Sequence, residues 1–405
     1  MKKLVAAVWM IGAAVAATHG SDWPQWRGPN RDGVAGSFTE PARWPETLTV
    51  RWKTTVGSGH ASPVLVGDRI YLHTRQQDDE VVSAIDAASG KIVWQDRYPA
   101  PYTMHPAATR HGPGPKSTPA VAGGRIYTLG ISGILSALDA NTGKVLWRKP
   151  APAALPLYGT AMSPVVDGPL VIAHVGGHDR GALTAFDAPT GAEKWSWAGD
   201  GPSYASPVIA TIGGTKQIVT LSQDRMVGLS AATGQLLWSL PLSTPHTQNA
   251  VTPIVRGDTI IYTGLENPVT AIRPVMIDGM WRADKVWENA AEDMYMSSPV
   301  LVGDTLYGMA NRNRGHFFAL DAQSGKTLWA TPGREGENAA IVRAGKLLFM
   351  LKNDAELVIA RPNPASFEVV RRYTVAESPT WAMPVVDGNR IFVKDVETLT
   401  LWTVS

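Results

Sequence analysis

The fold is decided by the stretch Asp139-Ala140-Asn141-Thr142-Gly143-Lys144-Val145-Leu146-Trp147, because its pattern recurs along the chain. A glycine followed four residues later by tryptophan returns at Trp94, Trp195, Trp238 and Trp329, with an Asp or Ser four residues before each glycine. An Asp side chain accepts backbone N–H bonds in a tight turn, and glycine adopts the left-handed conformation that the turn needs. The stretch therefore predicts a turn that leads into a strand carrying the tryptophan.

A second recurring feature lies upstream of each copy, where a hydroxyl or small residue precedes a proline and a short apolar run. Proline is tolerated at the first residue of a strand, where its missing N–H does least harm. The prolines are Pro63, Pro119, Pro164, Pro207, Pro253, Pro299 and Pro384. The segment from Asn338 to Leu348 fits the same frame without the proline. We count eight units of roughly 41–56 residues, the length of a four-stranded propeller blade.

One unit shows how the four strands arise. Val64–Val66 is a short buried strand, and Gly67-Asp68 is a two-residue hairpin turn. Arg69–His73 alternates as the second strand, Val81–Ile85 is the third, and the strand with Trp94 is the fourth. The tryptophan ring is expected to pack between neighbouring units and bury a large apolar area. This pattern alone allows a propeller or a stacked β-solenoid.

The ends of the chain favour a closed ring. The last unit, from Pro384, has three strands, and Thr49–Lys53 with Trp52 has the pattern of the missing fourth strand. A solenoid needs polar capping units, and the sequence shows none. We therefore predict an all-β protein over residues 48–405, a single eight-bladed β-propeller of four-stranded antiparallel blades closed by an N-terminal strand. Two units depart from the pattern: Arg273–Lys285 reads as a long third-to-fourth connection, and Phe367–Val370 replaces a tryptophan strand.

Two segments precede the propeller. Residues 1–20 combine a basic start, a short apolar stretch and small residues suited to cleavage, which predicts a signal peptide and an exported, periplasmic protein. An N-terminal membrane anchor is the alternative. Residues 21–47 form an N-terminal arm that contains the segment Asp22–Gly33. We expect Trp23 and Trp26 of this arm to dock on the ring, in preference to a role in ligand binding.

Composition narrows the function. The chain has 405 residues, a formal net charge of +2 and no basic run, which argues against a nucleic-acid partner. It has no cysteine, so disulfides, thiolate metal sites and a lipidated cysteine are excluded. No stretch after the N-terminus is long and apolar enough for a membrane span. No nucleophile elbow, phosphate-binding loop or His-Glu-x-x-His motif occurs. We expect a monomer.

The repeat of Asp139–Trp147 resembles the pyrroloquinoline-quinone (PQQ)-type propeller repeat. That family includes eight-bladed quinoprotein alcohol dehydrogenases and the propeller of the outer-membrane assembly factor BamB. The resemblance covers about residues 48 to 405 and implies the fold, with PQQ as a conceivable cofactor. It also implies a Glu, Asn and Asp set that holds calcium, but no motif of this chain places that set, and we predict no metal site. The adjacent cysteines of the dehydrogenases and the lipid-anchoring cysteine of BamB are missing.

The candidate site lies on one face of the propeller. Connections between blades and second-to-third-strand loops share this face and vary most, and such variation usually marks a binding face. The candidate ligand-binding residues around the funnel are His60, His111, Lys116, Tyr158, Tyr204, Asn249, Tyr295, Arg312, Asn338 and Trp381. Aromatic rings with cations and amides can stack a flat ring and pair carboxylates. A quinone with carboxylates, a peptide segment or an acidic sugar would suit them, and His60 and His111 are the best acid–base candidates.

These observations favour a protein that is not an enzyme. The leading hypothesis is an exported interaction module that binds an unidentified protein or a small carboxylate- or quinone-like ligand through its loop-rich face. One alternative is a divergent PQQ-dependent oxidoreductase. Another is an envelope-assembly scaffold similar to BamB. Catalytic residues cannot be named from this sequence.

Overall fold

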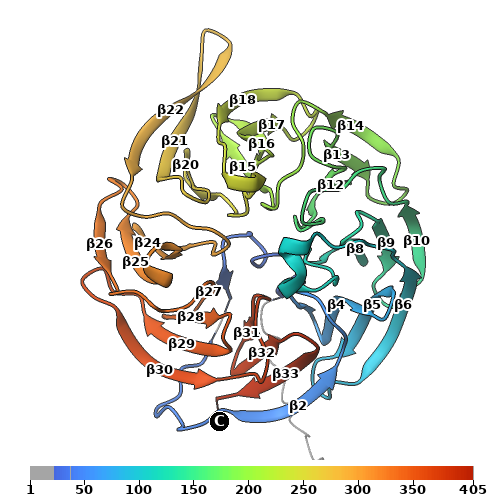
Figure 1. Cartoon of the computed structure of the whole chain (residues 1–405), viewed down its shortest axis with the longest axis vertical. Helices are drawn as coiled ribbons and strands as arrows, with labels where there is room; N and C mark the ends of the chain where they lie inside the picture. The colour runs from blue at the N-terminus through green and yellow to red at the C-terminus, as the bar shows by residue number, and fades with distance from the viewer. Residues whose placement is uncertain (1–21, 37, 405) are drawn as a thin grey trace, which may run out of the picture.

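The computed structural model describes residues 22–36 and 38–404, and the predicted signal peptide lies outside them. Eight antiparallel sheets radiate around a central axis, which confirms the predicted eight-bladed β-propeller (Figure 1). Strands make up almost all of the regular structure; the short helices are η1 (Pro106–His111), η2 (Pro245–Thr247) and η3 (Arg312–Arg314). In the described part of the chain, no helix combines the length and apolar character needed to cross a membrane.

Each blade runs from a short inner strand at the axis to an outer strand at the rim, and blades are numbered here in chain order. Blades 1 to 4 comprise β3 (Val64–Val66), β4 (Arg69–Gln76), β5 (Asp79–Asp86) and β6 (Ile92–Pro99); β7 (Ala120–Ala122), β8 (Arg125–Leu129), β9 (Leu135–Asp139) and β10 (Val145–Lys149); β11 (Val165–Asp167), β12 (Leu170–Val175), β13 (Ala182–Asp187) and β14 (Glu193–Trp197); and β15 (Val208–Ile212), β16 (Thr215–Leu221), β17 (Arg225–Ser230) and β18 (Leu236–Pro241).

Blades 5 to 8 follow the same order. They comprise β19 (Ile254–Arg256), β20 (Thr259–Tyr262), β21 (Val269–Ile277) and β22 (Met280–Asn289); β23 (Val300–Val302), β24 (Thr305–Ala310), β25 (His316–Asp321) and β26 (Thr327–Ala330); β27 (Ala339–Ala344), β28 (Leu347–Lys352), β29 (Glu356–Arg361) and β30 (Glu368–Thr374); and β31 (Val385–Asp387), β32 (Arg390–Lys394), β33 (Thr398–Thr403) and β2 (Thr49–Thr55).

The N-terminal strand closes the ring. β2 pairs antiparallel with β33, and Trp52 lies opposite Leu401. The last blade is thus completed from the other end of the chain, as the sequence predicts. A closed ring leaves only short sheet edges open to other chains.

The recurring motif encodes a contact between neighbouring blades. The indole of Trp94 in blade 1 donates a hydrogen bond to the carbonyl of Ala140 in blade 2, at 3.2 Å. Its ring lies on Gly143, where an added Cβ would come within 2.4 Å of the ring. Asp139 meanwhile accepts the Asn141 and Thr142 amides and so holds the turn. The same indole-to-carbonyl bond joins Trp52 to Ala87, Trp147 to Ala188, Trp195 to Ala231 and Trp287 to Ala322.

The hydroxyl residue that precedes most of the recurring prolines has a related role near the axis. The backbone N–H of Ser62 donates to the Thr118 hydroxyl at 3.1 Å, and the N–H of Thr118 donates to the Ser163 hydroxyl at 2.9 Å. Ser163 in turn donates to Ser206 in blade 4. These bonds link the starts of the inner strands of blades 1 to 4. The hydroxyl residue of the Ser/Thr-Pro pair therefore joins neighbouring blades as well as preceding a strand.

Blades 5 and 7 depart from this scheme. The sequence predicts a long connection at Arg273–Lys285. This prediction is wrong, because β21 and β22 stay paired up to Ile277 and Met280. The resulting hairpin projects from the ring (Figure 1). Blade 7 has a fifth strand, β1 (Val34–Ala35) from the arm, which pairs parallel with β27. The predicted four strands therefore hold for the other seven blades.

The arm crosses the central channel and bonds to the inner strands. Within its own blade, each inner strand pairs on one side only, so its other edge faces the axis. Trp23 exchanges two backbone hydrogen bonds with Leu65 of blade 1, and Val121 of blade 2 donates to the carbonyl of Pro24. On the far side of the channel, Arg343 of blade 7 donates to the carbonyl of Gly33. The arm thus plugs the channel by pairing with edges that the blades leave open.

Candidate functional site

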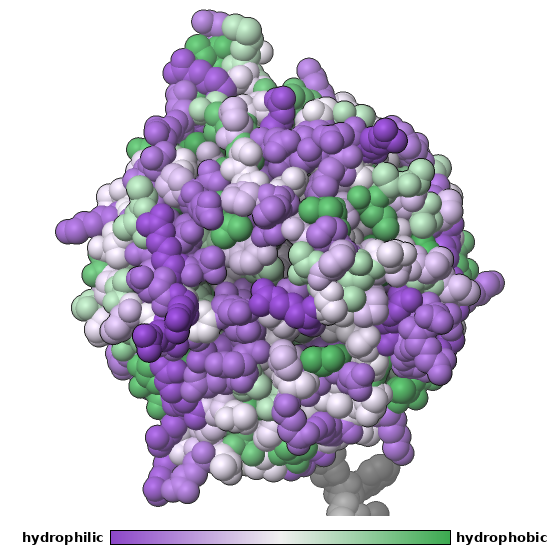
Figure 2. All heavy atoms as spheres, in the orientation of Figure 1, coloured by the Kyte–Doolittle hydropathy of each residue, from purple (hydrophilic) through white to green (hydrophobic). Residues whose placement is uncertain are grey.

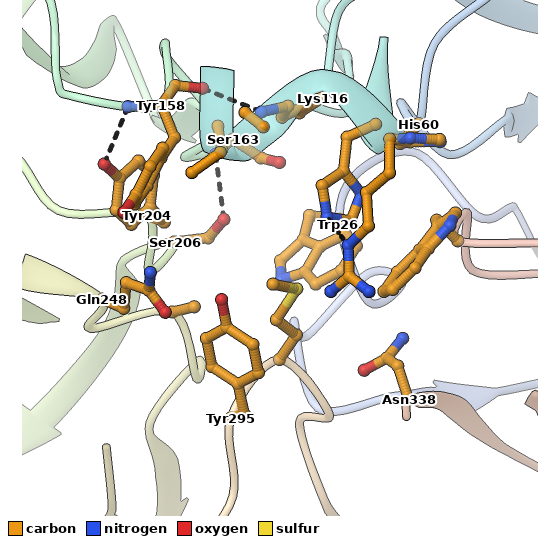
Figure 3. Close-up of a pocket in the computed structure, with 18 residues that line it drawn as sticks. Trp26, His60, Lys116, Tyr158, Ser163, Tyr204, Ser206, Gln248, Tyr295 and Asn338 are labelled. Atoms are coloured by element: carbon orange, nitrogen blue, oxygen red, sulfur yellow. Dashed lines mark hydrogen bonds between the residues drawn. The ribbon is translucent and has the colours of Figure 1, made fainter. Parts of the chain in front are cut away.

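A cavity of about 240 Å³ opens at the centre of the face that carries the blade-to-blade connections. Figure 2 shows a hollow near the middle of this face, bordered by both hydrophilic and hydrophobic residues. The cavity is lined by Trp26, His60, Ala107, Ala108, Arg110, His111, Lys116, Tyr158, Ala161, Ser163, Tyr204, Ser206, Gln248, Ala250, Tyr295, Met296, Asn338 and Trp381 (Figure 3). Among the described residues, no Asp or Glu contributes to this lining.

The residues reach the cavity because each blade begins beside the axis. His60, Lys116, Tyr158 and Tyr204 all lie shortly before an inner strand, at the ends of successive blade connections. The long connection between blades 1 and 2 adds the helix η1. Its N-cap is His105, whose Nδ1 accepts the amide of Ala107 at 3.2 Å, and a proline occupies its first turn. This helix places Arg110 and His111 at the cavity.

The floor of the cavity comes from the arm. The indole nitrogen of Trp26 donates to the hydroxyl of Thr252 at 2.8 Å, which fixes the ring across the channel. The next residue, Arg27, is fully buried and donates to the carbonyls of Ser298, Pro299, Arg31 and Asp32. Arg31 donates to the carbonyls of Ser163 and Pro164. The two arginines thus satisfy carbonyls at the ends of blades 3 and 6 that no strand reaches.

Burial lowers the pKa of both arginines, but both side chains stay protonated at neutral pH. Desolvation lowers the pKa of Arg27 to about 10, and desolvation followed by repulsion from Arg27 lowers the pKa of Arg31 to about 9. Neither forms a salt bridge with a carboxylate in the described chain. Two positive charges therefore lie in the plug, next to Trp26.

Lys116 is the principal cation of the cavity. Its ammonium group donates to the carbonyl of Tyr158 at 2.8 Å, and no carboxylate pairs with it among the described residues. Burial lowers its pKa to about 8, so the charged form still predominates at neutral pH. Arg110 lies at the rim, where it pairs with Glu337 at 2.8 Å and its guanidinium lies 5.8 Å from the centre of the Trp381 ring. The cavity has a cationic character.

Three aromatic rings cluster on one side of the cavity. His111 stands edge-on to Trp381, with ring centres 4.6 Å apart, and His60 lies 5.7 Å from His111. Desolvation, with repulsion from His111 and nearby lysines, lowers the pKa of His60 to about 3. Desolvation, with repulsion from Lys116 and Arg110, lowers the pKa of His111 to about 4. Both imidazoles are therefore neutral at pH 7, and the Nε2 atom of His60 is buried without a partner.

Three tyrosines line the opposite side. The Tyr204 hydroxyl accepts the amide of Tyr158 at 3.1 Å, and the two rings lie 5.9 Å apart. Burial raises the pKa of Tyr204 and of Tyr295, so both phenols stay protonated. Figure 3 shows the Tyr295 hydroxyl directed into the cavity. Rings of this kind, with hydroxyl groups at their tips, can hold a ligand that has both apolar and polar faces.

The structure brings together eight of the ten residues expected from the sequence. His60, His111, Lys116, Tyr158, Tyr204, Tyr295, Asn338 and Trp381 line the cavity. Asn249 lies behind it, fully buried, and its amide donates to the carbonyls of Ser222, Gln223 and Leu242. Arg312 lies outside the lining, where it donates to the carbonyls of Ala290 and Ala291. The side chains of Asn249 and Arg312 therefore stabilise loops through backbone carbonyls.

The sequence did not predict that Trp26 forms the floor of the cavity. Trp26 was expected only to dock on the ring, yet it both docks and lines the cavity. Its segment stands apart from the repeat, with two tryptophans and two arginines within a few residues, and that density was the available signal. Arg110, Ser163 and Ser206 also line the cavity and were absent from the predicted set.

The residues do not fit a calcium-held quinone. Calcium takes oxygen ligands and usually several carboxylates. The cavity offers none in its lining, and nowhere among the described residues do three His, Cys, Asp or Glu side chains gather as a metal-binding group. The cations and rings suit carboxylates and a flat ring, but the donor set for the metal is lacking.

Comparison with known proteins agrees with the geometry of the ring. A family model described as outer membrane protein assembly factor BamB matches residues 38–109 and 78–331. The chain belongs to this BamB family of PQQ-type propellers. BamB of Yersinia pestis is 26% identical over 317 residues, a match that covers 75% of this chain and 65% of that protein. The chain thus spans less than two thirds of that relative.

Quinoprotein dehydrogenases share the same architecture. The quinohemoprotein alcohol dehydrogenase ADH IIB of Pseudomonas putida is 36% identical over 117 residues, which cover 28% of this chain and 17% of the dehydrogenase. The structure of quinohemoprotein alcohol dehydrogenase from Comamonas testosteroni superposes with a TM-score of 0.70 at 17% identity, over 96% of this chain and 81% of that one. At that identity the superposition shows the fold alone.

Proposed function

We propose that this BamB-family propeller is a binding module, which holds a small ligand in the central cavity of its loop-rich face and does not itself catalyse a reaction. The observation that carries the proposal is the composition of the cavity: aromatic rings surround a half-buried Lys116, which has no carboxylate partner among the described residues, above the Trp26 floor. Such a mixture of apolar walls with a few convergent polar groups is typical of ligand sites. His60 and His111 lack a carboxylate to orient them, which argues against general-base catalysis.

A binding panel tests this proposal. Purified protein is melted by differential scanning fluorimetry with PQQ, aromatic carboxylates, neutral sugars, acidic sugars and extended peptides, each with and without calcium. Dye-linked oxidation of ethanol is assayed in parallel. We expect one ligand class to raise the melting temperature of the wild type and not that of Tyr295→Ala, with no dye reduction. Turnover with PQQ and calcium, or the absence of any ligand-induced shift, would contradict the proposal.

Assembly of other envelope proteins is a second candidate function, and the family match is what favours it. In that case the protein would be exported and its rim, including Arg110 and Glu337, would contact a protein partner. A photo-crosslinking residue at Glu337, compared with one at the outer-edge residue Leu146, tests this in cells. Partner bands that depend on position 337 support the scaffold role, and identical patterns at both positions oppose it.

A further inference from the structure

The positively charged groups at the cavity favour a negatively charged ligand. Lys116 is half-buried and its ammonium group bonds to the Tyr158 carbonyl, and the rim carboxylate of Glu337 is already paired with Arg110. The buried cations Arg27 and Arg31 add positive potential next to the floor. A carboxylate on the ligand would give Lys116 the charge-assisted hydrogen bond that the protein does not provide.

The cavity also requires a hydrogen-bond donor. The Nε2 atom of His60 is buried without a partner. The backbone of His111 raises the pKa of this imidazole against the larger effect of burial, as a carbonyl group does beside a ring N–H, so we assign the proton of the neutral ring to Nδ1. With that tautomer, Nε2 is left as an acceptor. A buried acceptor is costly unless a donor meets it. A hydroxyl group on the ligand meets that need, and a benzoate-type acid has none to offer.

The remaining lining suits a ring with one apolar face and several hydroxyls. Trp26 provides a flat floor, and Tyr158 and Tyr204 stand beside it. Ser163 and Ser206 each accept a backbone N–H, so their own hydroxyl protons are free to be donated. The cavity volume of about 240 Å³ lies just below the common range for drug-sized ligands, roughly 300–1,000 Å³. A ligand the size of one sugar ring matches it.

We infer that the ligand is an acidic sugar, a pyranose that bears a carboxylate, as in a uronic acid. Its carboxylate pairs with Lys116, a ring hydroxyl donates to Nε2 of His60, and its apolar face lies on Trp26. This inference rests on the proposed function, because it names the ligand class of the same cavity. Trp26 becomes a binding residue supplied by the arm, outside the repeat.

Titration calorimetry with sodium glucuronate, glucose and sodium benzoate tests the three requirements separately. We expect glucuronate to bind, glucose to bind at least about tenfold more weakly because it lacks the charge, and benzoate at least about tenfold more weakly because it lacks a donor. The inference is overturned if benzoate binds as tightly as glucuronate, or if glucose does.

Two variants assign the contacts. Lys116→Met should reduce glucuronate affinity about tenfold and leave glucose affinity unchanged, whereas His60→Phe should weaken both sugars. Lys216→Met is the matched control, because Lys216 pairs with Asp167 on the surface, far from the cavity lining. An unchanged preference of Lys116→Met for glucuronate over glucose would contradict the assignment.

A pH titration of the wild type gives a readout that needs no variant. The groups that face Lys116 are His60, His111, Arg110, Tyr158 and Tyr204, and the histidines are already neutral above pH 5. Since the pKa of Lys116 is about 8, glucuronate binding should weaken as pH rises from 7 to 9 while glucose binding stays constant. Lys394 titrates in the same range but bonds backbone carbonyls, and Lys116→Met removes only the Lys116 contribution.

The two proposals fail in different ways. If a peptide or PQQ shifts the melting temperature and glucuronate does not bind, the acidic sugar is wrong and the binding module stands. If glucuronate binds with equal affinity to wild type and to Trp26→Ala, the sugar lies elsewhere on the molecule and the acidic sugar is wrong; the binding module is wrong as well only if no ligand of the panel raises the melting temperature. Binding of glucuronate that depends on Trp26, Lys116 and His60 supports both.

Discussion

The rim and the axis of this propeller are held together in different ways. At the rim, one motif is reused: a tryptophan of one blade lies on the Gly and bonds the Ala of the next, as Trp94 does with Gly143 and Ala140. At the axis, the arm makes contacts that each occur once, such as Arg27 with Pro299 and Trp26 with Thr252. Repetition builds the scaffold, and the unrepeated segment completes the site.

The largest effect on stability is expected from a substitution of Gly143 at the rim. Gly143 and Gly124 have nearly the same backbone, with φ of +74° and +72°, but only Gly143 has a neighbouring ring over it. Gly143→Ala should reduce the free energy of unfolding by about 4 kcal/mol, from backbone strain plus collision with Trp94. Gly124→Ala should cost about 1 kcal/mol from strain alone. Urea denaturation measures both, and equal losses would show that the ring contact contributes nothing.

The matching test at the axis is Arg27→Met. The change leaves the carbonyls of Ser298 and Pro299 without their donor, while it removes the cost of burying a charge. We expect a net loss of about 2 kcal/mol. Arg69→Met, which removes a half-exposed pair with Asp86, is the control and should cost under about 0.5 kcal/mol. Similar values for the two variants would contradict a structural plug.

Acid stability probes the cavity side of the axis. Because the pKa of His60 is lowered from 6.5 to about 3 by burial, the unfolded chain binds a proton below pH 6.5 that the folded chain does not. Stability should therefore fall as pH drops from 6.5 towards 3. Between pH 7 and 5.5 this residue contributes about 1 kcal/mol of the loss. His60→Phe should flatten the curve of unfolding free energy against pH by that amount, and parallel curves would refute the neutral buried imidazole.

The smallest expected effect isolates one bond at the rim. Trp195→Phe keeps a ring in place but removes the bond from the indole to the carbonyl of Ala231. We expect a loss of about 1 kcal/mol, the usual net value of one hydrogen bond. Trp197→Phe, on the same strand and without such a bond to a neighbouring blade, is the control. If Trp197→Phe lost more unfolding free energy than Trp195→Phe, the bond from Trp195 to Ala231 would not be the contact that stabilises the rim.

The sequence predicts the rim well and the axis poorly, for a physical reason. The Asp-Ala-x-x-Gly turn and the tryptophan encode a contact between neighbours, so each copy repeats the same information, and the pairing of Trp52 with Leu401 follows from it. The sequence did not predict that β21 and β22 stay paired as far as Met280, because these strands continue past the point where the strands of other blades end in a turn.

The candidate site shows the same division. Residues just before the inner strands could be placed at the axis from the repeat alone, which is why seven of them line the cavity, while His111 reaches it from η1. The direction of a loop side chain depends on which backbone groups it meets, so Asn249 turned inward to three carbonyls. Trp26 belongs to no repeat, and nothing periodic could have placed it under Lys116.

The most direct test of the plug is hydrogen exchange at the inner edges, measured amide by amide. Leu65, Val121 and Arg343 donate to carbonyls of the arm, at Trp23, Pro24 and Gly33. The corresponding amides of Ile209 and Val255, two residues after their prolines, receive no arm carbonyl among the described residues. We predict exchange at least about a hundredfold slower at the first three positions. Equal exchange at all five positions would mean that the arm does not plug the channel, and the floor of the proposed site would be lost with it.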